Sequence, residues 1–315
     1  MIFFDGFLDT YYAYDFSHPV NNERTFTTQP QRHNEPSINL VHLGLNLKQN
    51  EWRGRLALQA GNSVEANTLY EPNPDLGHIQ ESYLGHKFGD VWVDAGVYLG
   101  NIGMESWISK NNFTYTRSLQ LDYVPYYSAG IRASYELDSS THLEFHLMNG
   151  WQNISETNSA KAVGTQYKAK NFTYNTFFGD EKVLPGQKDR FRTYHNFIFE
   201  SKLNDNWKNQ TSFDVGTQAQ QKNDGVDSWL AFATTFQQKL TEKNFMGYRV
   251  EYYSDPHQSN ILTDSDYGFQ VASASVNFDH HFGQNLLWRN EFRSYHSKDH
   301  VKNSSVVVTT LAASF

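Results

Sequence analysis

The chain has 315 residues, a formal net charge of −8 and no cysteine, and its mean hydropathy is −0.66. The lack of cysteine excludes disulfides, zinc–thiolate sites and thiol catalysis, and an acidic balance without any Lys/Arg block argues against a nucleic-acid partner. Aromatic residues make up 16% of a chain in which only 38% of residues are hydrophobic, which is typical of a surface that meets a membrane interface.

The sequence contains no run of about 18 apolar residues, so it predicts no transmembrane helix. A transmembrane β-barrel is compatible with this hydropathy, because its strands alternate lipid-facing and lumen-facing residues. The opening MIFFDGFLDT is too polar for a signal peptide, and we therefore expect a mature chain from which the signal peptide is absent.

Apolar and polar residues alternate with a period of two along most of the chain, which predicts strands and leaves little sign of helices. In residues 40–48 the face of Val41, Leu43 and Leu45 opposes the face of His42 and Gly44. The same alternation follows, in chain order, in residues 52–60, 91–99, 127–137, 141–148 and 286–295. Such segments predict half-exposed strands rather than a soluble core.

The connections between these strands alternate between short and long. The short ones carry Asn, Asp and Gly, as hairpin turns do, and lie at 49–51, 89–90, 138–140, 168–170, 204–206, 241–243 and 283–285. The long ones lie near 17–33, 66–78, 100–124, 152–162, 180–189, 219–225, 256–265 and 297–302. The sequence therefore predicts an all-β fold: a closed antiparallel transmembrane β-barrel of about 16 strands, with short periplasmic turns and long extracellular loops, forming a single domain over residues 1–315.

The C-terminal stretch VVVTTLAASF places Phe315, Leu311 and Val307 on one face. An open sheet edge cannot lie in lipid, so we expect the last strand to pair with the first and close the barrel. Phe315 and Leu311 also resemble the assembly signal of bacterial outer-membrane proteins, although many β proteins simply end on a strand.

Several stretches resemble a family of β-barrel porins of the OmpL-like type. They are DGFLDTYYAYDF (5–16), RHNEPSINLVHLGL (32–45), LALQAGNSVEAN (56–67), VWVDAGVYLGNIGMESWISKNNFTYTRSL (91–119), PYYSAGIRASYEL (125–137) and LMNGWQNI (147–154). The resemblance is close over most of the first half and rests on pattern in the second. It implies a barrel in the outer membrane of a Gram-negative bacterium. Lipid, lipopolysaccharide and the outer-membrane assembly machinery are then the expected partners. General porins, which the chain resembles in its strand count, are commonly trimers, so a homo-oligomer is also expected.

The longest connection, Gly100–Val124, is the third long loop. In general porins the third extracellular loop folds inward, and by that resemblance this one would narrow the pore. It would contribute Glu105, Lys110, Arg117 and Asp122, while Trp107, Phe113, Tyr115 and Tyr123 would pack it against the wall. The alternative is a loop that caps the barrel from outside.

Charged residues on the polar strand faces are expected to point into the lumen, because Arg or Lys facing lipid near mid-membrane costs about 2–4 kcal/mol. The predicted pore-lining residues are Asp5, Asp9, Arg53, Arg55, Asp94, Arg132, Glu136, Glu144, Arg192, Arg249, Glu251, Arg289, Glu291 and Arg293. Two interpretations remain open: a transverse field that favours small polar solutes, or struts that pair across the lumen, above all Arg289, Glu291 and Arg293.

No metal, cofactor or enzyme active site is predicted. His280 and His281 lie on opposite strand faces, and His142 and His146 are about 13 Å apart along a strand. No motif of a serine hydrolase, zinc protease or P-loop is present. The predicted function is passive diffusion of small hydrophilic solutes and ions. The alternatives are a non-conducting barrel that acts as a scaffold, adhesin or subunit of a surface complex, and, less well supported by the aromatic surface, a soluble β-sandwich or propeller.

Overall fold

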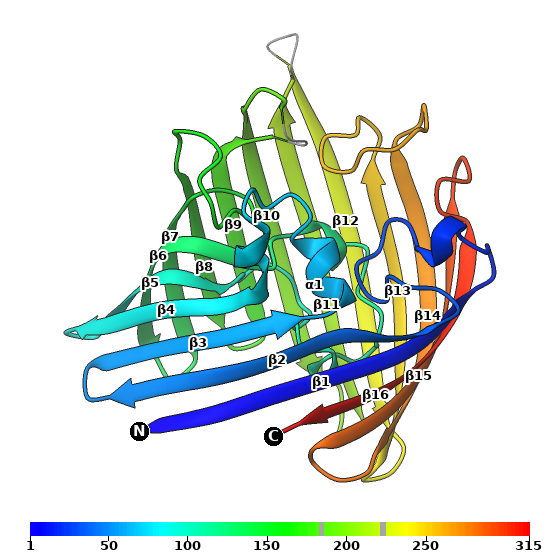
Figure 1. The fold of residues 1–315 in the computed structure, drawn as a ribbon, viewed down its shortest axis with the longest axis horizontal. Helices are drawn as coiled ribbons and strands as arrows, with labels where there is room; N and C mark the ends of the chain where they lie inside the picture. The colour runs from blue at the N-terminus through cyan, green and yellow to red at the C-terminus, as the bar shows by residue number, and fades with distance from the viewer. Residues whose placement is uncertain (183–185, 221–224) are drawn as a thin grey trace.

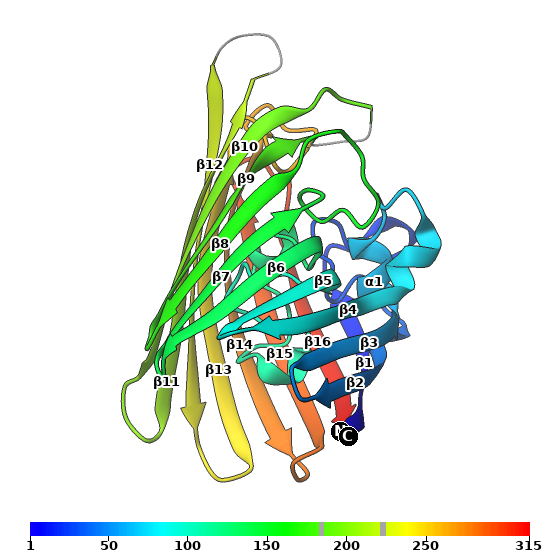
Figure 2. The ribbon, with the colours of Figure 1, turned by 90° about the vertical axis from the view of Figure 1, so that its left-hand side faces the viewer.

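In the computed structural model, which describes residues 1–182, 186–220 and 225–315, a single antiparallel sheet closes on itself (Figures 1 and 2). Every strand pairs with its neighbours in sequence, and β16 pairs with β1. The strands are β1 (Ile2–Asp15), β2 (Pro36–Gln49), β3 (Trp52–Ala60), β4 (Ile79–Phe88), β5 (Val91–Leu99), β6 (Tyr127–Asp138), β7 (Thr141–Met148), β8 (Ala162–Ala169), β9 (Phe172–Glu181), β10 (Arg190–Lys202), β11 (Trp207–Ala219), β12 (Val226–Lys239), β13 (Asn244–Asp255), β14 (Phe269–His281), β15 (Leu286–Ser297) and β16 (Ser304–Ser314). The predicted 16-stranded all-β barrel is thus confirmed.

Closure depends on the C-terminal strand, as the sequence predicted. The register of β16 against β1 runs from Phe7 opposite Ser314 to Asp15 opposite Val306. The backbone N–H of Phe315 donates to Gly6 O at 3.1 Å, and Gly6 N donates to Phe315 O at 3.1 Å. No edge of the sheet is left open at this seam, which is the condition for a sheet to span lipid.

The alternation of side chains separates an outer face from an inner face. Large apolar side chains such as Leu43 (56% exposed), Leu58 (54%) and Val250 (59%) point outward, whereas neighbouring polar residues such as Gln59 and Glu251 are buried inside. Because the period of a strand is two, a shift of one residue would place charge on the lipid face, and this fixes the register. No helix among the described residues is long and apolar enough to span a membrane.

Short turns and long loops gather at opposite ends of the barrel, and both termini lie at the turn end (Figures 1 and 2). The long connections predicted at 180–189 and 219–225 lie partly outside the described residues. The loops contain one short helix, α1 (Asn62–Asn67), and four 3₁₀ turns, η1 (Val20–Asn22), η2 (Pro74–His78), η3 (Ser109–Asn111) and η4 (Leu121–Tyr123), in the part of the chain that the structure describes. Strands β1–β5 cross the front of Figure 1 at a steep tilt, whereas β11–β14 stand more upright.

Candidate functional site

The third loop (residues 100–124), which lies between β5 and β6, makes hydrogen bonds to two separate parts of the barrel wall. On one side, Asn101 Nδ2 donates to Asn175 Oδ1 of β9 at 3.3 Å. Gly103 N donates to Asn196 Oδ1 of β10 at 3.2 Å. The beginning of the loop is therefore tied to the wall formed by β9 and β10.

The other side of the loop is held by carboxylates of β13 and β15. Glu291 accepts from Thr116 N at 2.6 Å and from Thr116 Oγ1 at 2.8 Å. Glu251 accepts from Leu119 N at 2.6 Å. Both carboxylates are buried, so they replace the hydrogen bonds that a loop in water would make with solvent.

Three arginines of β13 and β15 also hold the third loop, because they donate hydrogen bonds to its backbone carbonyls. Arg289 donates to Ser109 O at 2.9 Å, to Asn112 O at 2.8 Å and to Thr114 O at 3.1 Å; Arg249 donates to Thr116 O at 2.5 Å; Arg293 donates to Arg117 O at 2.5 Å. The arginines are themselves ion-paired, Arg249 with Glu291 at 3.3 Å, Arg289 with Asp279 at 2.6 Å, and Arg293 with Glu251. We call the inner faces of β13, β14 and β15 the covered wall, because the third loop lies over them.

Gly247 of β13 allows the loop to approach the covered wall closely. A Cβ built on Gly247 would lie 2.1 Å from the carbonyl oxygen of Phe113. Any side chain at this position would therefore displace the loop. Glycine within a strand often marks such a close approach of another backbone segment.

The four charged residues predicted for the constriction lie in different surroundings. Glu105 accepts from Ser118 and pairs with Arg249 at 3.1 Å, and its burial raises the pKa of its carboxyl. Lys110 reaches the turn end, where its Nζ donates to Gln284 O at 2.9 Å. All four lie on the third loop, and their part in a pore constriction stays a prediction.

The remaining two, Arg117 and Asp122, are buried. The guanidinium carbon of Arg117 lies 4.0 Å from the ring centre of Tyr126 and 4.7 Å from that of Trp107, and burial lowers the pKa of Arg117 to about 10. Asp122 accepts from Thr28 Oγ1 at 2.6 Å, and burial raises the pKa of its carboxyl.

Other loops at the long-loop end of the barrel make hydrogen bonds to the third loop or to one another. Besides the contact of Thr28 with Asp122, Gln29 of the first loop donates to Tyr115 O at 2.7 Å. Lys302, between β15 and β16, donates to the first loop at Phe26 O at 3.0 Å. Asn260, between β13 and β14, donates to Tyr123 O at 3.3 Å. These hydrogen bonds connect the first loop, the third loop and the β13–β14 and β15–β16 connections.

The inner faces of β3–β7, with the turn end of β1, form a second wall, which we call the open wall. Several of its charged side chains remain partly exposed, with Arg53 at 28%, Arg132 at 18% and Asp5 at 32%, whereas Asp94 is buried. They are paired along the wall, with Arg53 and Arg132 both on Asp94 and Arg55 on Asp5. Glu144 accepts from His142 at 2.9 Å and from His146 at 3.0 Å.

The predicted pore-lining residues therefore fall into three groups. The open wall holds Asp5, Arg53, Arg55, Asp94, Arg132, Glu136 and Glu144; the covered wall holds Arg249, Glu251, Arg289, Glu291 and Arg293; Asp9 and Arg192 are buried elsewhere on the inner face. Asp9 accepts from Ser109 of the third loop at 2.8 Å and from Asn39 of β2 at 2.8 Å. Arg192 lies between the rings of Trp151 and Trp229, at 5.1 and 5.4 Å.

Sequence reasoning missed several partners of these residues. Glu81 pairs with Arg55 and Asp279 with Arg289, yet neither acid was included among the predicted lining residues. Their own strands show no feature that singles them out, because each acquires its partner through cross-strand register. Asp279 lies directly before His280 and His281, which the sequence analysis considered only as possible metal ligands.

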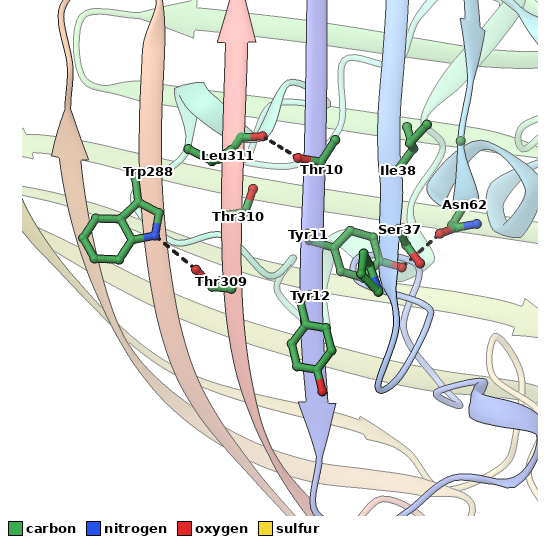
Figure 3. A pocket seen from close by; sticks show the side chains of 12 residues that line it. Thr10, Tyr11, Tyr12, Ser37, Ile38, Asn62, Trp288, Thr309, Thr310 and Leu311 are labelled. Atoms are coloured by element: carbon green, nitrogen blue, oxygen red, sulfur yellow. Dashed lines mark hydrogen bonds between the residues drawn. The ribbon is translucent and has the colours of Figure 1, made fainter.

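A groove on the outer surface is distinct from this interior (Figure 3). It runs across β15, β16, β1 and β2 and is lined by Thr10, Tyr11, Tyr12, Pro36, Ser37, Ile38, Gly61, Asn62, Trp288, Thr309, Thr310 and Leu311. Trp288 Nε1 donates to Thr309 Oγ1 at 3.1 Å, and Thr10 Oγ1 donates to Leu311 O at 3.3 Å. The apolar side chains of Ile38, Trp288 and Leu311 are exposed on the outer face, so the groove belongs to the lipid-facing surface, where these hydrogen bonds satisfy its polar groups.

Comparison with known proteins agrees with this geometry. The sequence model of a family described as "Putative beta-barrel porin-2, OmpL-like" matches residues 1–312. None of the curated proteins is a significant match.

Solved structures share the fold at low sequence identity. An anion-selective porin from Comamonas acidovorans has a TM-score of 0.66 and 7% identity, with 100% of this chain and 99% of that chain covered. A trimer form of OmpT, an outer membrane protein of Vibrio cholerae, has a TM-score of 0.62 and 10% identity, with 100% and 99% covered. A triple mutant of the Rhodopseudomonas blastica porin has a TM-score of 0.54 and 10% identity, with 100% of both chains covered.

Proposed function

Because this chain belongs to the family of OmpL-like β-barrel porins, we propose that it is a channel for passive diffusion of small hydrophilic solutes and ions. The family and the barrel fold point to the bacterial outer membrane. The third loop, residues 100–124, narrows the lumen, and the mixed charges beside the remaining space set which solutes pass.

The observation that carries this proposal is the contrast between the two walls. Arg249 and Arg293 on the covered wall have fully buried side chains, whereas the side chains of Arg53 and Arg132 on the open wall remain partly exposed. Charged side chains that stay hydrated inside a barrel are typical of a water-filled path.

The interlocked loops limit the size of the path. Contacts from the first loop and from the β13–β14 and β15–β16 connections reach the third loop or one another. We therefore expect a small single-channel conductance, compared with a barrel of equal strand number whose loops stay outside.

Other parts of the proposal concern partners. Porin families are in general non-enzymatic, and we propose transport rather than catalysis. We also propose that the barrel forms a homo-oligomer, that it contacts lipopolysaccharide and other outer-membrane lipid, and that Phe315 and Leu311 are recognised by the assembly machinery. Both side chains are exposed, at 75% and 49%.

The test is single-channel recording after reconstitution of the full chain into planar bilayers. We expect stable current steps, which grow when residues 104–122 are replaced by a short Gly/Ser linker. The same linker placed in the exposed turn at residues 240–243 is the control and should leave the steps unchanged. A barrel that inserts, judged by its heat-modifiable gel mobility, yet passes no current would refute diffusion and favour the scaffold or adhesin alternative.

A further inference from the structure

A row of inward-facing residues runs across the open wall at one level. Arg53 of β3 lies opposite Gly85 of β4, Gly85 opposite Asp94 of β5, and Asp94 opposite Arg132 of β6. The row thus places one arginine on each side of a single carboxylate, that of Asp94. Asp94 is fully buried, whereas both arginines reach the lumen.

Gly85 makes this arrangement possible. A Cβ at Gly85 would lie 2.0 Å from Oδ1 of Asp94, so the carboxylate occupies the space that a side chain on β4 would fill. From there Asp94 accepts hydrogen bonds from Arg53 Nε and Nη2, each at 2.6 Å. It also accepts hydrogen bonds from Arg132 Nη2 at 2.8 Å and from Arg132 Nε at 3.0 Å.

Aromatic rings hold both guanidinium groups from the side. The guanidinium carbon of Arg53 lies 4.5 Å from the ring centre of Trp92, and that of Arg132 lies 4.7 Å from the ring centre of Tyr98. Stacking, together with two hydrogen bonds from each guanidinium to Asp94, fixes the orientation of both groups. The two arginines are therefore preorganised rather than mobile.

Each guanidinium keeps one nitrogen free. Within residues 1–182, 186–220 and 225–315, neither Arg53 Nη1 nor Arg132 Nη1 donates a hydrogen bond. Both side chains are partly exposed, so these donors meet the water of the lumen. Two arginines and one aspartate give the row one excess positive charge, which the carboxylate of Glu144 on β7, acting on Arg132, partly offsets.

The neighbouring acids of the open wall are already engaged. Asp5 is paired with Arg55 at 2.6 Å, and Glu81 is paired with the same arginine. Glu144 accepts from two histidines. These contacts weaken the repulsion that a negatively charged solute would meet beside the row.

We propose that Arg53 and Arg132, held by Asp94, form a subsite that binds the carboxylate or phosphate group of small anionic solutes during their passage. This inference rests on the proposed diffusion function for its physiological meaning. Arginine suits this role because its planar fork matches the oxygens of carboxylate and phosphate groups. The subsite selects solutes by charge at one level of the lumen, whereas the third loop selects them by size.

The test measures binding of inorganic phosphate to the folded, detergent-solubilised barrel by ³¹P NMR line broadening, which does not depend on conduction. We expect saturable broadening for the wild type. Arg53→Gln and Arg132→Gln should each weaken binding about tenfold or more, because each removes a charge-assisted donor. Arg53→Lys keeps the charge but loses the fork, and should also weaken binding.

Lys168→Gln is the matched control. Lys168 is an exposed cation that faces the same interior, opposite His142 in register, but lies outside the row. Its removal should leave phosphate affinity unchanged. Equal losses in all variants would show a general effect of lumen charge and overturn the subsite, as would absence of saturable binding to the wild type.

Bilayer recordings of the same proteins separate this inference from the diffusion proposal. Phosphate binding by a barrel that passes no current would refute diffusion and leave the subsite standing. A conducting barrel without saturable phosphate binding would do the opposite.

Discussion

The ion pair of Arg289 and Asp279 should contribute strongly to the stability of the covered wall. Both side chains are 2% exposed, and Arg289 Nε donates to Asp279 Oδ1 at 2.6 Å. Arg289 also supplies three hydrogen bonds to carbonyls of the third loop, at 2.8 to 3.1 Å. The substitution Arg289→Gln removes the pair and these bonds at once.

The expected cost follows from what remains buried. Asp279 would keep Asn277 as a donor, at 2.5 Å, but its charge would be unpaired, and breaking a buried pair typically costs about 3–5 kcal/mol of unfolding free energy. Asp279→Asn should cost a similar amount, because it strands the guanidinium. The double variant loses mainly the three loop bonds, at about 1 kcal/mol each.

The double variant should therefore be destabilised by about 3 kcal/mol, well below the sum of the two single effects. Urea unfolding of the detergent-folded barrel, followed by tryptophan fluorescence, measures all three free energies. Lys239→Gln, in the exposed pair with Glu242, is the control and should cause no measurable change. Additive single effects, with no coupling between the two sites, would refute the view that this pair holds the loop.

Three further variants test separate contacts. Gly247→Ala places a Cβ against Phe113 O and should destabilise the barrel by about 1–3 kcal/mol while raising single-channel conductance; unchanged conductance would contradict close packing of the loop. Burial, followed by the charges of Arg24 and Arg293, lowers the pKa of Lys302. The neutral Lys302 amine therefore stabilises the first loop at high pH, and this stabilisation is lost as the pH falls through the lowered pKa. Protease cleavage of the first loop should therefore increase on acidification in the wild type and much less in Lys302→Met; parallel pH profiles would argue against this role. Phe315→Ala should reduce the yield of assembled barrel in cells, measured by heat-modifiable gel mobility, more than the control Phe282→Ala in an exposed turn.

The barrel could be predicted from the sequence because lipid and lumen impose opposite demands on alternate residues. In residues 40–48 the apolar set Leu43 and Leu45 is exposed on the outer face, and His42 is buried inside, as the alternation required. Turns such as Gly89–Asp90 are recognisable because their residue types suit hairpins. The terminal pairing followed from the need to close the sheet, and the observed register of Leu311 opposite Thr10 agrees with it.

The partners within the interior could not be predicted in the same way. Alternation shows that Arg55 and Arg289 point inward, but their pairing with Glu81 and Asp279 depends on register between strands. A bulge between β1 and β2, where Asp9 and Thr10 pair with Leu40 and Ile38, turns Asn39 toward Asp9, and alternation alone predicts the wrong face for such a residue. The loop's contacts depend on empty space at Gly247, which is a property of the folded wall.

Both walls carry arginines, but their surroundings differ because the third loop covers only one of the two walls. Arg249 and Arg293 are buried beneath the loop, where they form ion pairs with Glu251 and Glu291 and hydrogen bonds with the loop's carbonyls. Arg53 and Arg132 lie on the wall away from those contacts and keep free donors. The chain's net charge of −8 is therefore a poor guide to ion preference, because selectivity depends on the charges that remain hydrated beside the path. If the loop were released from the covered wall, its arginines would join the lumen, and we expect the reversal potential to shift toward anion preference as the conductance rises.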